Sequence, residues 1–278
     1  MENEKEGPAS LPPILRGKEP AAPSVFTPEN LLREARRQKR LAVGAVPDVC
    51  ILDPDGDMVR HLLATDRARR HPEWACYHTD LYVFEHEGLS CGIVGCAVGA
   101  AFAVLVAEEL FASGCKVLVS VTSAGQILPV QAPPYFIVID RALRDEGTSY
   151  HYLAPAEYSA ADEALVRLGK EALATAGIAV QVGATWTTDA PFRETAHAIE
   201  AARQAGMLAV EMEAAALYAF AKARKRPVLC FAHVTNQMGR IEGDFEKGLA
   251  DGAEESLRLV AAVARAYEAQ QTSVQTGF

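Results

Sequence analysis

The sequence predicts an α/β fold, a single three-layer α/β domain with a central mixed sheet flanked by helices. From residue 48 onward, short apolar runs of β type alternate with helical segments, which is typical of layered α/β domains. Continuous apolar runs such as 116–121 suit strands that are buried on both faces. Half of the 278 residues are hydrophobic, which is enough for a sizeable core.

The chain begins with a segment of different character. Residues 1–25 are rich in Pro, Glu and Ala and show no hydrophobic period, so we expect a flexible or loosely draped arm ahead of a domain at 26–278. Thr27 followed by Pro28 predicts a capped helix start, and the helix should cover about 28–40. Its arginines and lysine indicate a solvated basic face, with contact to a partner subunit or an anion as the alternative.

Periodicity and turn residues define the remaining elements. The predicted strands are 48–52, 81–86, 91–96, 116–121, 135–140, 179–185, 207–211 and 227–234. The predicted helices are 57–65, 99–113, 160–176, 193–205, 213–224 and 252–268.

Polar segments follow several of these strands: 122–125, 187–189, 211–213 and 235–237. Ligands of open α/β sheets bind outside the carboxyl ends of the strands. The sequence therefore predicts one site at this edge of the sheet. His233, within an apolar run, is interpreted as a core residue whose hydrogen bonds are satisfied.

Composition excludes several classes of protein. The net charge of −9 argues against a general nucleic-acid binder, because phosphate backbones need a basic surface. The six cysteines lack zinc-ligand spacing and are expected to be buried free thiols; no metal and no cofactor is expected. The first residues contain no apolar signal core, and no stretch has membrane character, so we expect a cytoplasmic protein with no membrane contact.

The most informative stretch is Glu211-Met212-Glu213, where an apolar run becomes an alanine-rich helix. Burying a carboxylate without partners costs several kcal/mol, so two of them at an element junction indicate a site for hydroxyls or cations. The alternative is helix capping, since acids in a first turn offset the helix dipole.

Four motifs together resemble one known family. They are Glu-Met-Glu-Ala-Ala-Ala-Leu from 211, Asp-Glu-Gly-Thr-Ser from 145, Thr-Trp-Thr-Thr-Asp from 185 and Val-Ser-Val-Thr-Ser-Ala-Gly from 119. In this order they resemble the nucleoside phosphorylase superfamily, most closely its uridine phosphorylase branch, over roughly residues 45–268. The resemblance implies cleavage of the N-glycosidic bond of a nucleoside, in a homodimer or higher homo-oligomer.

The resemblance also assigns roles on the sugar and base sides. Glu213 would bind the 2′- and 3′-hydroxyls of the ribose, with Met212 against the sugar and Glu211 supporting the loop. The expected base-side and catalytic residues are Thr188, Asp189, Phe192, Arg193, Asn236 and Gln237. Phe192 would stack on the base and Arg193 would bind a carbonyl, unless Arg193 and Glu194 form an ordinary ion pair at a helix start.

On the nucleophile side the sequence departs from the family. The expected residues are Ser120, Thr122, Ser123, Asp57 and His78. The family's phosphate-binding arginines are absent: acidic residues of 53–57 replace the first, Ser120 stands at the second, and the third aligns near Tyr77-His78. Phosphorolysis would need replacement cations such as His78, Arg60 or Arg144; otherwise water is the nucleophile.

Three functions therefore stay open. The favoured one is a uridine phosphorylase-like enzyme of nucleotide salvage with inorganic phosphate as co-substrate. The second is a nucleosidase that uses water. The third is a non-catalytic nucleoside-binding protein that kept the fold.

Overall fold

A ten-stranded mixed sheet forms the centre of the computed structural model, which describes residues 11–239 and 242–276. Its strand order is β10-β6-β8-β9-β5-β1-β4-β3-β2, with β7 paired to β6. The strands are β1 (Val49–Asp53), β2 (Ala68–Arg70), β3 (Tyr82–His86), β4 (Leu89–Gly95), β5 (Val117–Gln126), β6 (Tyr135–Asp145), β7 (Tyr158–Ala160), β8 (Val180–Thr188), β9 (Ala209–Glu211) and β10 (Val228–Asn236).

The sheet closes on itself at one end. β10 pairs with β6 and also, in parallel, with β5, so that β5, β10, β6, β8 and β9 form a ring of paired strands. β1 pairs in parallel with both β4 and β5 and links this ring to the open part of the sheet. β1, β5 and β10 run parallel, so their carboxyl ends lie at one edge. β9 runs antiparallel to β5 but pairs with its last residues, which brings the carboxyl ends of β9 and its parallel neighbour β8 to the same edge.

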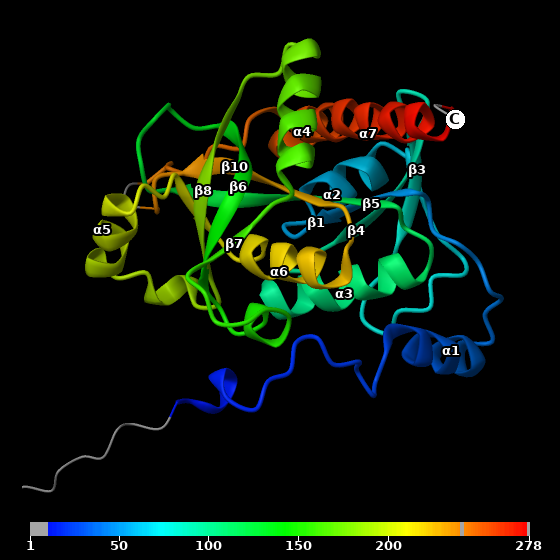
Figure 1. The fold of residues 1–278 in the computed structure, drawn as a ribbon. Helices are drawn as coiled ribbons and strands as arrows, with labels where there is room; N and C mark the ends of the chain where they lie inside the picture. The colour runs from blue at the N-terminus through cyan, green and yellow to red at the C-terminus, as the bar shows by residue number, and fades with distance from the viewer. Residues whose placement is uncertain (1–10, 240–241, 277–278) are drawn as a thin grey trace, which may run out of the picture.

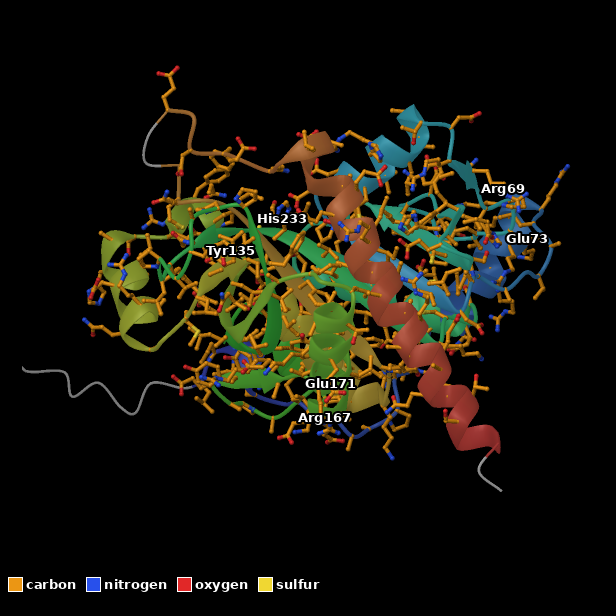
Figure 2. The ribbon with its side chains drawn as sticks, turned by 90° about the horizontal axis from the view of Figure 1, so that it is seen from above. Arg69, Glu73, Tyr135, Arg167, Glu171 and His233 are labelled. Carbon is orange, nitrogen blue, oxygen red and sulfur yellow. The ribbon has the colours of Figure 1, made fainter. Side chains whose placement is uncertain are left out.

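Helices cover both faces, as Figure 1 shows. The helices are α1 (Pro28–Lys39), α2 (Asp57–Ala64), α3 (Ala100–Ala112), α4 (Glu163–Thr175), α5 (Ala196–Gln204), α6 (Ala214–Arg224) and α7 (Ala253–Thr276). The pair α3 and α6 lies on one face and α2, α4 and α7 on the other; Figure 2 shows α7 crossing its face from above. The predicted α/β class with a central mixed sheet flanked by helices is confirmed.

The helix starts follow their caps. Thr27 Oγ1 accepts a hydrogen bond from Asn30 N at 3.3 Å and Pro28 occupies the first position of α1, as predicted. The predicted start of a helix at 160 was wrong, because Asp162 caps α4 and the preceding residues form β7. The predicted start at 193 was also early, because Thr195 caps α5 through Ala198 N.

Two short strands were not predicted. β2 consists of Ala68, Arg69 and Arg70, whose side chains are largely exposed, so it has no apolar pattern to detect. It adds to β3 by antiparallel backbone pairing, and Ala68 alone among its residues packs against the core. Both β2 and β7 have three residues and depend on a neighbour that tertiary structure supplies.

The predicted arm is partly outside the described residues, which begin at 11. Of the rest, Pro13–Leu15 form a 3-10 turn that lies against the turn Ser149–His151. The cysteines are free thiols, and five are buried as expected; the expectation was wrong for Cys96, which is exposed after β4 at a φ of 62°. Every described helix is too short or too polar to cross a membrane.

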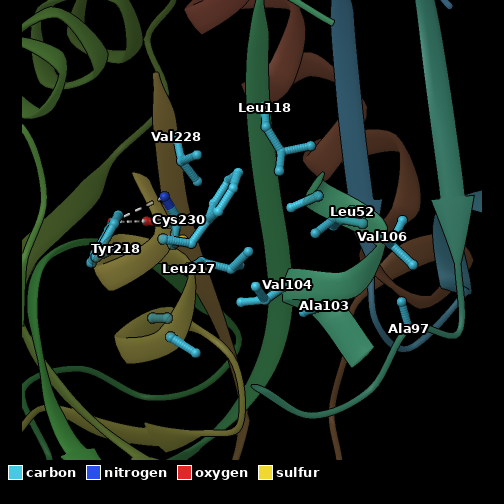
Figure 3. Close-up of a cluster of buried hydrophobic side chains, with 14 of the residues drawn as sticks. Leu52, Ala97, Ala103, Val104, Val106, Leu118, Leu217, Tyr218, Val228 and Cys230 are labelled. Atoms are coloured by element: carbon cyan, nitrogen blue, oxygen red, sulfur yellow. Dashed lines mark hydrogen bonds between the residues drawn. The ribbon is translucent and has the colours of Figure 1, made fainter. Parts of the chain in front are cut away.

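A polar bridge in the core joins the middle of α6 to the sheet (Figure 3). The Tyr218 side chain is 1% exposed, and its hydroxyl donates to Ile139 O at 2.6 Å and accepts from Cys230 N at 3.0 Å. Tyr218 thus joins α6 to β6 and β10. A buried amide that loses such a partner retains its full desolvation cost.

We expect Tyr218→Phe to lower the free energy of unfolding by about 1–3 kcal/mol, because it leaves Cys230 N–H without the hydroxyl. Urea unfolding should show a lower midpoint with an unchanged slope. The matched control is Tyr77→Phe, since that hydroxyl lies at the surface and, among the described residues, bonds only Gln38. Equal midpoints for the two variants would show that the bridge contributes nothing to stability.

Candidate active site

A cavity of about 330 Å³ opens at the edge where the strands end. Its walls come from the ends of β5, β9 and β10 and from the segments that follow β1, β4 and β8. The lining residues are Pro54, Asp55, Val98, Thr122, Ser123, Ala124, Gly125, Pro191, Phe192, Glu194, Val210, Glu211, Met212, Glu213, Asn236, Met238 and Phe245. A larger groove of about 770 Å³ includes Pro227 and Val228 at the start of β10, so it lies at the opposite edge of the sheet.

Seven residues expected from the sequence line this cavity together: Thr122, Ser123, Phe192, Glu211, Met212, Glu213 and Asn236. Others lie outside its wall: Ser120, Asp57, His78, Thr188, Asp189, Arg193 and Gln237. The first group lies on or just after four strands, β5, β8, β9 and β10, whose carboxyl ends lie at the same edge of the sheet.

Glu213 is the most deeply buried acid of the cavity, with 1% of its surface exposed. Its Oε1 accepts from Gly99 N at 2.7 Å and its Oε2 accepts from Thr122 Oγ1 at 2.9 Å. Gly99 precedes α3, so an amide at the start of this helix binds a carboxylate of the chain itself. Burial, followed by the charge of Glu211, raises the pKa of Glu213 to about 8.

Glu211 performs the capping. Its Oε2 accepts from the backbone amides of Glu213 and Ala214, each at 2.7 Å, at the start of α6. Its Oε1 accepts from the hydroxyls of Thr185, at 3.0 Å, and Thr187 on β8. Glu213 makes no capping bond with its side chain. The capping alternative therefore applies to Glu211, and the Glu213 carboxylate is left facing the cavity.

On the opposite wall, Asp55 occupies the donors of Ser123. The backbone N–H and the hydroxyl of Ser123 both donate to Asp55 Oδ2, at 2.7 and 2.6 Å. An N–H and an O–H that converge on one point suit an anion. Here that anion is a carboxylate of the chain itself, supplied by the loop after β1.

Behind this pair lies a second, much smaller cavity of about 10 Å³, roughly the volume that one water molecule needs. Asp55, Thr122 and Ser123 line both cavities and form the wall between them. His233 also lines the small one, is 6% exposed and has no hydrogen-bond partner at Nε2 among the described residues. The interpretation of His233 as a satisfied core residue was wrong on this point.

His233 does not supply positive charge near neutral pH. Its ring stacks on Phe136 with centroids 4.5 Å apart. Burial, then the charge of Lys247, lowers its pKa to about 4. On the same side, burial raises the pKa of Asp53 to about 7, against hydrogen bonds from Val59 N and Gly56 N.

Two of the candidate replacement cations, Arg60 and Arg144, are engaged elsewhere, and so is Lys247, which was not among the candidates. Lys247 Nζ lies 2.5 Å from Asp57 Oδ2, and Arg60 also pairs with Asp57. Arg144 donates to Ser149 Oγ and Ala154 O at 2.8 Å within its own loop. Across the described residues, neither cavity has a lysine or arginine in its wall.

The side expected to meet a base is mostly apolar. Phe192 lies in the turn Pro191–Arg193 and is 99% exposed at the cavity mouth. The Asn236 amide is engaged locally: Oδ1 accepts from Met238 N at 2.9 Å and Nδ2 donates to Thr235 Oγ1 at 3.2 Å. Arg193 is exposed.

The remaining expected residues hold loops or lie apart. Asp189 Oδ2 accepts from Gly147 N at 2.8 Å and so joins the loops after β8 and β6. Thr188 Oγ1 accepts from Ala190 N at 3.1 Å, and the Gln237 backbone N–H donates to the Asp244 carboxylate. Ser120 is buried within β5, and His78 is exposed near Phe102.

Sequence reasoning did not single out Glu194 as a site residue. It lines the cavity, is half-buried and makes no ion pair with Arg193, although an ion pair was the alternative for these neighbours. Burial raises its pKa to about 7. The sequence did contain a signal for Glu194, because this acid directly follows Phe192 and Arg193, which were expected to contact the base.

Comparisons with known proteins agree on one family. The model of the phosphorylase superfamily matches residues 48–266. A curated relative, a uridine phosphorylase of Thermococcus kodakarensis, is 27% identical over 236 residues, which cover 74% of this chain and 84% of the relative.

The pKa of Glu213 makes stability depend on pH. The folded state holds this proton up to about pH 8, whereas an unfolded glutamate releases it near 4.5. The resulting penalty is absent below the unfolded pKa, grows as pH rises and is complete above the folded pKa. We expect the free energy of unfolding of Glu213→Gln to rise relative to the parent by at least about 1 kcal/mol between about pH 5 and pH 8.

Urea unfolding at several pH values measures this difference. Glu171→Gln is the control, because Glu171 lies on the exposed surface of α4 (Figure 2). Its stability should run parallel to the parent's. A parallel curve for Glu213→Gln as well would mean that Glu213 is ionised in the fold at all these pH values.

Proposed function

The chain belongs to the nucleoside phosphorylase superfamily, and from this premise we propose that it cleaves the N-glycosidic bond of a nucleoside with water as the acceptor. We choose water because the N–H and O–H of Ser123, which could bind a phosphate, already donate to the Asp55 carboxylate. Uridine is the first substrate to test, because the curated relative is named for it.

Glu213 would hold the ribose. A carboxylate has about four acceptor positions, and Gly99 N and Thr122 Oγ1 use two of them, so two remain for vicinal hydroxyls. Positive charge that develops on the sugar favours the ionised form of Glu213 and lowers its pKa from about 8. The attraction is stronger in the transition state than in the bound substrate, which is the condition for catalysis.

Asp55 would act as the base for water. Its carboxylate lies in the wall between the 330 Å³ cavity and the water-sized one. It can therefore accept a proton from a water on the sugar side. Ser123 holds the carboxylate in place with two bonds. A phosphate at this position would meet Asp55 without a lysine or arginine in the described wall to offset the repulsion.

Phosphorolysis is the second candidate, and the similarity to a uridine phosphorylase favours it. In that case Asp55 must release Ser123 so that phosphate can take its two donors. Lys247 and Arg60 would then have to turn from Asp57 towards the anion. We expect weak phosphate affinity if the reaction takes this route.

A product assay separates the two candidates. A panel of nucleosides is incubated with and without inorganic phosphate, and the sugar product is identified. Free ribose formed at the same rate in both conditions supports hydrolysis. Sugar 1-phosphate as the sole product, with saturation at low phosphate, would overturn it. No product from the whole panel would instead favour a non-catalytic nucleoside-binding protein.

Asp55→Asn should slow hydrolysis by about 10²-fold or more, because an amide cannot accept the proton of water. If phosphate is the acceptor, the same change removes the competing charge, and the phosphate concentration at half saturation should fall. The matched control is Asp66→Asn: Asp66 is exposed at a φ of 54°, which asparagine tolerates. Unchanged turnover and phosphate dependence in Asp55→Asn would remove Asp55 from the mechanism.

Glu213→Gln should reduce kcat/KM by the equivalent of about 2–4 kcal/mol, because it keeps the size but removes the charge at a developing cation. The amide can still accept from Gly99 N and donate to Thr122, so the fold should persist; thermal unfolding checks this. Near-normal kcat/KM on a nucleoside that the parent cleaves would refute the ribose-binding role.

A further inference from the structure

Glu194 occupies a distinctive place in the cavity. The turn Pro191–Arg193 follows β8, and Glu194 ends it at the cavity wall, half-buried. Within the described part of the chain, its carboxyl has no hydrogen-bond or ion-pair partner, whereas Glu211, Glu213 and Asp55 in the same wall are all held by donors. Burying a carboxyl group without partners is costly, so this one is kept for something that enters the cavity.

Its neighbours place it on the side of the base rather than of the sugar. Phe192 belongs to the same turn, and Asn236 and Met238 line the cavity with it. Both polar atoms of the Asn236 amide already bond within their own loop. Glu194 is therefore the side chain of this group that is free to exchange a proton with a ligand.

We propose that Glu194 is the general acid that protonates the departing nucleobase. This inference rests on the proposed cleavage of a nucleoside, but it holds for water and phosphate acceptors alike, because it concerns only the leaving group. The substrate class is a nucleoside whose base presents a proton acceptor, a carbonyl oxygen or a ring nitrogen, towards the Pro191–Glu194 segment.

The electrostatic setting supports this role. Burial raises the pKa of Glu194 to about 7, so that much of it carries a proton near neutral pH. The other titratable groups of the cavity wall are Asp55, Glu211 and Glu213, all acids; Arg193 and His197 nearby are exposed. A general acid works best when its pKa lies near the working pH. The arrangement thus places a protonated carboxyl at the base and the Asp55 carboxylate, held by Ser123, at the water.

The chemical step balances as follows for water. The C1′–N bond breaks and its electron pair goes to the base, while the Glu194 O–H bond breaks and its proton goes to the same base. The oxygen of water bonds to C1′, and its proton goes to Asp55. After release of base and ribose, Glu194 regains a proton from solvent and Asp55 returns one to it.

The test compares two leaving groups in Glu194→Gln. The substrates are the nucleoside that the parent cleaves best and 4-nitrophenyl β-ribofuranoside, whose leaving group is stable as an anion and needs no proton. We expect kcat/KM to fall by about 10²-fold or more on the nucleoside and to change little on the nitrophenyl riboside. In addition, the loss of parent activity as pH rises should disappear in Glu194→Gln with the nucleoside. Glu171→Gln should match the parent on both substrates.

A second variant separates acid chemistry from packing. Glu194→Asp keeps an acid and should retain more activity on the nucleoside than Glu194→Gln. Equal losses on both substrates in Glu194→Gln, or full activity on the nucleoside, would overturn the inference while the proposed cleavage stands. A parent protein that cleaves no nucleoside would overturn both.

Discussion

The buried carboxylate of Glu211 is the contact on which the site depends. It accepts four hydrogen bonds, two from hydroxyls of β8 and two from the first amides of α6. Because these donors come from separate elements, one side chain sets where β9 ends and where α6 begins. Glu213 therefore reaches the cavity with its carboxylate free of capping duty. Burial disfavours the ionised form of Glu211 and so raises its pKa, and the four hydrogen-bond donors offset part of this effect.

The charge of the cavity wall around Asp55 likewise depends on which donors and cations bind each acid. Three aspartates mark the connection from β1 to α2, and each has different partners: Asp53 ends β1, Asp55 lies in the loop and Asp57 begins α2. Backbone amides donate to Asp53, and Ser123 donates to Asp55. Arg60 and Lys247 form ion pairs with Asp57. Among the described residues of this region, the cations that could attract a free anion are therefore already paired. The wall that remains suits a neutral nucleophile better than a doubly charged one.

Much of the fold was predictable because its signals are local. Apolar runs such as 116–121 and 227–234 have the length and β-branched content of buried strands, and Thr27, Gly99 and the Glu211–Glu213 junction mark helix starts in the sequence itself. The elements that escaped prediction, β2 and β7, carry no such pattern and form only because β3 and β6 offer an edge. The residues Thr122, Ser123, Met212 and Glu213 reach one cavity because the short strand β9 pairs antiparallel with the last residues of β5.

By itself, the sequence determined the class of fold, the order of its elements and the family, since these depend on hydrophobic period, caps and contiguous motifs. Tertiary structure alone decided how each acid is used. Glu211 and Glu213 are two residues apart, yet one caps α6 and the other faces the cavity. Asp55 meets Ser123 across 68 residues of chain, and Glu194 makes no ion pair with the exposed Arg193 beside it. Partner choice and burial set the charge of a carboxyl group, and both depend on which distant elements pack around it.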